Sequence, residues 1–222
     1  MSVQIPALIS AYFQQVPDVT LPAQQVSFGT SGHRGSALKN NFNEQHILAI
    51  SQAVVEFRKQ QGITGPMYVG IDTHALSVPA LGSVLQVLVA NGVQVKVDSE
   101  QGFTPTPLVS RAIIQYNQSG PSGLADGLII TPSHNPPEDG GIKYNSPDGG
   151  PAAADITNWI QQRANALLAD KLQDVKRVSL NQALDQVEQN DFVTEYVEQL
   201  DSVVDMSVLQ ASKLKIGVDP MG

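Results

Sequence analysis

Short apolar runs alternate with longer segments of helical periodicity along the first 150 residues of the chain. The apolar runs have the length of buried strands, and they span residues 26–28, 67–71, 93–97 and 128–130. Between them, apolar residues recur at intervals of three and four, which predicts helices over residues 43–61, 77–91 and 105–117. This alternation predicts an α/β fold in which helices cover a mostly parallel sheet.

The two ends of the chain follow other patterns. Residues 1–25 are polar and rich in Gln and Pro, so we interpret them as an N-terminal arm with a short helix near residues 6–15. Beyond residue 150, residues 156–168 predict a helix whose apolar face carries the single Trp into the core, and residues 191–205 predict another. Residues 213–218 predict a last strand with no helix after it, like the start of a further α/β unit.

Composition excludes several classes of function. The 222 residues carry a net charge of −8 and have a pI near 4.8, which argues against a nucleic-acid partner because such binders need a basic face. The chain has no Cys, which excludes disulfides, Fe–S clusters and a thiol nucleophile. No Lys or Arg precedes Arg34, and no apolar run approaches ~20 residues, so we expect a cytoplasmic protein without a membrane partner.

Polar residues gather directly after the four predicted strands. The loops concerned are residues 29–35, 72–74, 103–107 and 131–137, and they hold three of the four His residues and Arg34. In an open α/β sheet, ligands bind outside the carboxyl ends of the strands, so these loops predict one shared site. The glycines of the first loop are three apart, which is neither a dinucleotide-binding pattern nor a P-loop. Its backbone N–H groups could approach an anion beside Arg34; a tight surface turn with a solvated Arg34 is the alternative.

The loop at residues 131–137 is stiffened by its prolines and holds a candidate nucleophile, Ser133. It lacks the G-x-S-x-G pattern of a hydrolase, and the adjacent His134 is not placed as its base. Downstream, Gly140-Gly141 predicts a turn that returns residues 142–145 as an antiparallel strand and brings Lys143 within reach of Ser133. A lysine in such a place has a lowered pKa and can move protons near neutral pH. A proline-rich surface loop and a solvated lysine are the alternatives.

These motifs resemble those of the α-D-phosphohexomutases. Residues 131–145, Thr-Pro-Ser-His-Asn-Pro-Pro-Glu-Asp-Gly-Gly-Ile-Lys-Tyr-Asn, are similar to the phosphoserine loop of that superfamily, and residues 29–35 to its N-terminal signature. Residues 72–77 and 103–107 resemble the bacterial glucose-specific members. The resemblance implies a layered α/β/α domain I with a mixed sheet over residues 26–205, preceded by the arm and followed at residues 206–222 by a truncated start of domain II.

The resemblance also implies a reaction and a role for each motif residue. Glucose 1-phosphate and glucose 6-phosphate would interconvert through a phosphoserine enzyme and a glucose 1,6-bisphosphate intermediate. Ser133 would carry the phosphate and would bind Mg²⁺ through it. The remaining metal ligands would lie beyond residue 222. Lys143 would be the general acid/base. The other residues implied in catalysis or phosphate binding are Arg34, His134, Thr30, Ser31, His33 and Asn135. A phosphoserine carries about −1.5 to −2 charges at pH 7, so it needs such cations nearby.

The chain departs from the family pattern in two respects. Asp72-Thr73-His74 stands where many members have Asp-x-Arg, and no Asp-Gly-Asp metal loop occurs. We therefore expect an N-terminal fragment that needs the remaining domains of its polypeptide and is inactive alone. The alternatives are a non-catalytic sugar-phosphate-binding module and a phosphomannomutase or phosphoglucosamine mutase relative. A small serine hydrolase is disfavoured, because no oxyanion motif is visible.

Overall fold

A computed structural model describes residues 3–29, 32–100 and 102–219, and its centre is a mixed six-stranded sheet. The strands follow the order β1-β5-β4-β2-β3-β6, where β1 is His33–Ser36, β2 Met67–Ile71, β3 Val95–Asp98, β4 Asp126–Ile130, β5 Asp139–Asn145 and β6 Glu188–Asn190. Strands β4, β2, β3 and β6 are parallel to one another, whereas β5 runs antiparallel to both β4 and β1. The predicted mostly parallel, mixed sheet is therefore confirmed.

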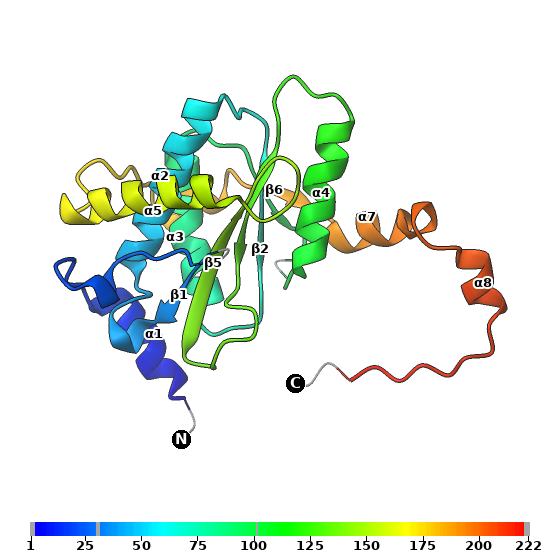
Figure 1. Ribbon diagram of the computed structural model, residues 1–222, viewed down its shortest axis with the longest axis horizontal. Helices are drawn as coiled ribbons and strands as arrows, with labels where there is room; N and C mark the ends of the chain where they lie inside the picture. The colour runs from blue at the N-terminus through cyan, green and yellow to red at the C-terminus, as the bar shows by residue number, and fades with distance from the viewer. Residues whose placement is uncertain (1–2, 30–31, 101, 220–222) are drawn as a thin grey trace.

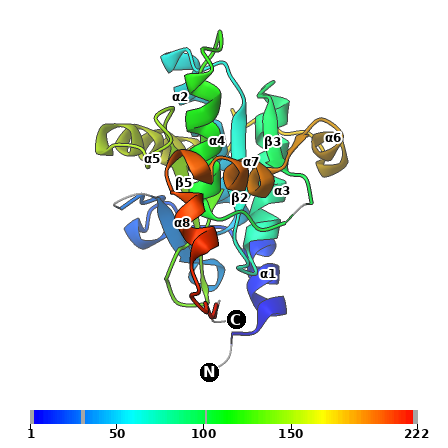
Figure 2. The ribbon, with the colours of Figure 1, turned by 90° about the vertical axis from the view of Figure 1, so that its right-hand side faces the viewer.

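Helices cover both faces of this sheet and complete three layers (Figures 1 and 2). On one side lie α2 (Glu44–Gln61), α3 (Ser77–Ala90), α5 (Ala154–Ala169) and the short α6 (Leu180–Leu184); on the other lie α4 (Thr106–Gln118) and α7 (Phe192–Glu198). The strands alternate accordingly: Leu128 and Ile130 of β4 join the larger core, and Ile129 between them joins the smaller one. Burial on both faces of the sheet explains why residues 128–130 of β4 are all apolar.

Local signals place the helices well. Helix α2 begins after Asn43, whose backbone N–H donates to His46 Nδ1, and it ends at Gly62, whose φ of +67° is a left-handed conformation that glycine adopts without strain. Ser77 does not cap α3 as its position suggests, because its hydroxyl donates to Asp72 instead. Trp159 packs against Phe57, as the apolar face of α5 predicts.

Val26 and Phe28 are buried, but residues 26–28 do not form the predicted strand. Asn165 of α5 accepts a hydrogen bond from the backbone N–H of Val26 and donates one to its carbonyl, while Gln161 accepts from the N–H of Phe28. Side chains of a helix thus replace a strand ladder. The first strand is β1 instead, so Arg34 lies on a strand and not in a loop.

The described part of the N-terminal arm, residues 3–25, packs against the domain. Helix α1 (Ile5–Gln14) is present where the short helix is expected, and its residues Leu8, Ala11 and Tyr12 are buried in the larger core. The Tyr12 hydroxyl donates to Ser83 of α3 over a distance of 2.9 Å. The segment therefore packs as part of the same domain.

The C-terminal prediction needs correction. The helix expected over residues 191–205 is broken into α7 and a 3-10 turn at Leu200–Ser202, and of its apolar residues only Phe192 is fully buried. A further short helix, α8 (Met206–Ala211), follows beyond the predicted range. Residues 212–219 form no strand and lie apart from the sheet, below α7 and α8 in the view of Figure 1, with Leu214, Ile216 and Val218 at least 75% exposed. A strand needs a neighbouring strand to satisfy its backbone, and no strand of the described residues forms a ladder with this segment. The strand missed was β6, three polar residues at the edge of the sheet.

Within the described residues, no helix is both long enough and apolar enough to cross a membrane.

Candidate active site

The loop that follows β4 holds Ser133 in a conformation that few residues adopt. Its φ is +71°, in the left-handed region where a side chain is strained, and its backbone N–H donates to Thr131 Oγ1 at 2.9 Å. The side chain of Ser133 is exposed at the carboxyl end of β4. Strained, exposed side chains at such positions are typical of reactive sites.

Lys143 lies directly against this serine. It is on β5, which runs beside β4, and its Nζ lies 2.5 Å from Ser133 Oγ. Burial lowers the pKa of the Lys143 ammonium, Arg34 nearby lowers it further, and the Asp72 carboxylate opposes both effects. The structure thus confirms the expected proximity and places a proton-donating group on the serine oxygen.

The turn that places Lys143 beside Ser133 is not the one predicted from the sequence. Gly140 and Gly141 lie inside β5, and the turn is made by residues 136–139, where the N–H of Asp139 donates to the Pro136 carbonyl at 2.9 Å. The two glycines are needed for close packing: a Cβ at Gly140 would collide with the Phe42 ring, and one at Gly141 with the backbone before Ser133. The glycine pair therefore signals close approach of strand and loop, not the turn.

Arg34 reaches the serine loop from β1. The side chain is half-buried, and its Nε donates to the Pro132 carbonyl at 3.0 Å, while Nη1 donates to the Gly32 carbonyl at 3.4 Å. Gly32 is required here, because a Cβ would collide with the backbone and side chain of Lys143. The guanidinium is thereby fixed beside the serine, where it can balance the charge of a phosphoryl group.

The other predicted site residues lie in different surroundings. Thr30 and Ser31 lie outside the described residues. His134 is exposed and makes no hydrogen bond to another described residue, and Asn135 donates to Asp139 within the turn. His33 is 1% exposed and stacks between Phe42 and His46 in the core, and burial lowers its pKa to about 3. A buried neutral ring cannot contact phosphate, so the structure argues against the expected role of His33.

The loop after β2 contributes two residues that were not among the predicted site residues. Asp72 Oδ1 accepts hydrogen bonds from Ser77 Oγ at 2.5 Å and from the backbone N–H of His74 at 2.9 Å. His74 in turn contacts the Pro137 carbonyl of the serine loop through Nε2, at 2.8 Å. The polar cluster after the second apolar run was the sequence signal for both.

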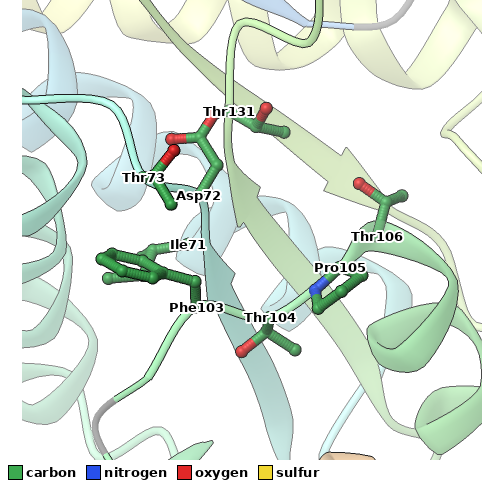
Figure 3. Close-up of a pocket in the computed structure, with 8 residues that line it drawn as sticks. All are labelled: Ile71, Asp72, Thr73, Phe103, Thr104, Pro105, Thr106 and Thr131. Atoms are coloured by element: carbon green, nitrogen blue, oxygen red, sulfur yellow. The ribbon is translucent and has the colours of Figure 1, made fainter. Parts of the chain in front are cut away.

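A cavity of about 320 Å³ opens beside the serine loop (Figure 3). Its lining residues are Ile71, Asp72, Thr73, Phe103, Thr104, Pro105, Thr106 and Thr131. Four hydroxyls and one carboxylate, with no cation among these residues, suit a neutral polyhydroxylated group better than a phosphate. The cations Lys143 and Arg34 contact Ser133 and the Pro132 carbonyl instead.

The described residues do not form a metal site by themselves, since no group of three His, Cys, Asp or Glu side chains among them could hold an ion. A phosphate on Ser133 would add oxygen ligands at this place, and the other ligands of an ion would have to come from elsewhere.

Comparison with known proteins shows the family. The model for phosphoglucomutase/phosphomannomutase, alpha/beta/alpha domain I, matches residues 25–170, and the chain belongs to this family. The family expected from the sequence is confirmed.

Two relatives and one solved structure illustrate the match. The chain is 55% identical to a phosphoglucomutase of Komagataeibacter xylinus over 99% of its own length, and 33% identical to phosphoglucomutase 2 of Saccharomyces cerevisiae over 74%. It spans about two fifths of the first relative and covers 28% of the second. A putative phosphomannomutase from Thermus thermophilus superimposes with a TM-score of 0.66 at 27% identity, over 83% of this chain and 37% of that one.

Proposed function

We propose that this chain is the part of a phosphoglucomutase that carries the phosphorylated serine. The observation that supports this most strongly is Lys143 Nζ at 2.5 Å from the oxygen of a strained, exposed Ser133, in a chain 55% identical to a phosphoglucomutase. The proposed reaction interconverts glucose 1-phosphate and glucose 6-phosphate through glucose 1,6-bisphosphate.

The proposed chemistry of this chain is one half of a phosphoryl transfer. The bond between Ser133 Oγ and phosphorus breaks as the bond from the sugar hydroxyl oxygen to phosphorus forms, and the Lys143 ammonium gives its proton to the serine oxygen that leaves. In the reverse direction the Lys143 amine removes that proton. Because the pKa of Lys143 is lowered, the amine form is easier to reach near neutral pH. Arg34 offsets the phosphoryl charge.

Several parts of the proposal depend on groups outside the described residues. We include Mg²⁺ bound to the phosphoserine, with its other ligands supplied by the remaining domains of the same polypeptide, and a location in the cytoplasm. The second half of the reaction, removal of the proton from the sugar hydroxyl, also falls to those domains. The isolated 222 residues should therefore show no measurable turnover.

The experiment is a coupled assay of glucose 6-phosphate formation by the complete gene product that carries these residues. We expect turnover in the wild type, and loss of both turnover and the phosphoenzyme in Ser133→Ala, detected by intact mass as the absence of an added phosphate. Ser119→Ala is the matched control, because Ser119 is an exposed hydroxyl at the far end of α4. A phosphorylated Ser133→Ala protein would refute the assignment of Ser133.

Two alternatives give distinct results in the same assay. A non-catalytic sugar-phosphate-binding module would bind glucose 6-phosphate without turnover. A phosphomannomutase would prefer mannose 1-phosphate, and the solved relative from Thermus thermophilus, described as a putative phosphomannomutase, is the reason to include that substrate.

A further inference from the structure

We propose that His74 is a positioning residue for the phosphorylated serine: its imidazole holds the far side of the serine loop by donating to the Pro137 carbonyl. The inference deepens the proposed function and rests on it for its kinetic consequence. The hydrogen bond is 2.8 Å long and joins two loops that are 63 residues apart in the sequence.

The hydrogen bonds define which ring nitrogen carries the proton. His74 Nδ1 accepts from the backbone N–H of Leu76 at 3.1 Å, so Nδ1 has no hydrogen of its own. The proton therefore lies on Nε2, which donates to the Pro137 carbonyl, a group that can only accept. The ring links the turn before α3 to the turn that follows Ser133.

Hydrogen bonds to Asp72 also hold the backbone of His74 in place. Its backbone N–H donates to Asp72 Oδ1, and the same oxygen accepts from Ser77 Oγ. The ring thus projects from a short loop that is tied at the end of β2, and it reaches the serine loop from a rigid base.

The serine loop is clamped at two carbonyls, one on each side of Ser133. Arg34 of β1 donates to the Pro132 carbonyl, and His74 donates to that of Pro137. Ser133 lies between them at a φ of +71°, a conformation that persists only when the surroundings impose it. Loss of the His74 donor would let the loop relax and would move Ser133 Oγ away from Lys143 Nζ.

Two substitutions separate positioning from a structural role. His74→Gln keeps an N–H donor for the Pro137 carbonyl and loses the acceptor at Leu76. His74→Asn keeps a short acceptor for the Leu76 N–H, as in an Asx turn, and is too short to reach Pro137. A positioning role predicts that the Gln variant keeps its activity and the Asn variant loses it. A purely structural role at the start of α3 predicts the opposite result.

The test measures kcat and KM of the complete gene product with glucose 1-phosphate, and hydrogen–deuterium exchange of the serine-loop peptide. We expect His74→Asn to lower kcat about 10- to 100-fold with KM changed less than about threefold, because small displacements of reacting groups have effects of this size. His74→Gln should stay within about threefold of wild type. Exchange at the serine loop should rise in the Asn variant only.

The two readouts keep the inference separable from the proposed function. Equal kcat in both variants, or loss in the Gln variant alone, would overturn the positioning role. If the wild type has no turnover, the proposed function fails, and hydrogen exchange alone then decides whether His74 holds the loop. Unchanged exchange in His74→Asn would overturn the clamp itself.

Discussion

Two polar clusters lie at opposite ends of β4, and they have similar chemical groups but different roles. Where β4 begins, Asp126 accepts hydrogen bonds from Arg58 at 2.9 Å and from the Tyr144 hydroxyl at 2.7 Å, and the side chains of Asp126 and Arg58 are at most 5% exposed. Where β4 ends, Lys143 lies against an exposed, strained Ser133. Tyr144 and Lys143 are neighbours on β5, so one strand serves both clusters.

The difference between the clusters lies in solvent access and in charge balance. Burial raises the pKa of the Asp126 carboxyl to about 6, although Arg58 and Tyr144 both favour its ionised form. At the other end, the cations Arg34 and Lys143 outnumber the one carboxylate that acts on Lys143, Asp72, so the cluster has positive charge that a phosphate would offset. A balanced buried cluster stabilises the fold, whereas an unbalanced half-exposed one is prepared for a ligand.

The largest expected effect is on activity, at the carboxyl end of β4. Lys143→Met in the complete gene product should lower kcat about 10²- to 10⁴-fold, the range of general acid–base catalysis, because the serine oxygen loses its proton donor. The melting temperature should change little, since the side chain lies at the rim. A coupled mutase assay and a thermal melt measure the two quantities. A folded variant with wild-type kcat would contradict the proton-transfer role.

The next largest expected effect is a loss of stability, from a substitution at the amino end of β4. Asp126→Asn leaves the Arg58 guanidinium buried without a counter-charge, which should lower the free energy of unfolding by about 3–5 kcal/mol in urea titrations. The double variant Arg58→Met/Asp126→Leu should recover most of that loss, because no buried charge remains. If the single variant were as stable as wild type, the cluster would not have the role assigned to it.

The smallest effect is a pH dependence from His33. Burial keeps its folded pKa at about 3, below the ordinary value of 6.5, so an unfolded chain takes up a proton that the folded protein does not. The stabilisation is therefore complete above pH 6.5 and is lost as the pH falls, by about 1 kcal/mol between pH 6.5 and 5.5.

His46 stacks on His33, and burial lowers its pKa too, so it adds to the same trend. His33→Asn removes one titrating ring and should flatten the dependence of unfolding free energy on pH in this range. An unchanged slope would mean that His33 is not the neutral buried group described above.

Sequence patterns predicted the elements that depend on local spacing. Helices α2, α3, α4 and α5 lie where the apolar periodicity places them, and β2 matches its apolar run residue for residue. Sequence patterns failed where apolar side chains are buried without forming a strand, as at Val26 and Phe28, and where a strand is polar and lies at the edge of the sheet, as in β6. Burial and strand pairing are separate properties, and an apolar run reports only the first.

The candidate site was predicted as a set of loops but not as a geometry. Ser133, Lys143 and Arg34 come together as expected, yet His33 turns into the core and His74 joins the loop. The face to which a side chain of β1 points depends on its register with β5, in which His33 lies opposite Ile142. A shift of one residue in this register would exchange the inward and outward side chains of β1. The register depends on pairing with a distant strand, so no local pattern in β1 predicts it.

The sequence by itself determined the family, helices α2, α3, α4 and α5, and the identity of the serine loop, because each depends on residues that are close together in the chain. Only the tertiary structure decided that Ser133 adopts a positive φ, that Lys143 meets it at 2.5 Å, and that Arg34 and His74 hold the loop from two sides. These contacts join segments up to 98 residues apart, and they arise from strand order and close packing of glycines against the loop. Such long-range pairing is a property of the whole sheet and is not encoded in any one segment of it.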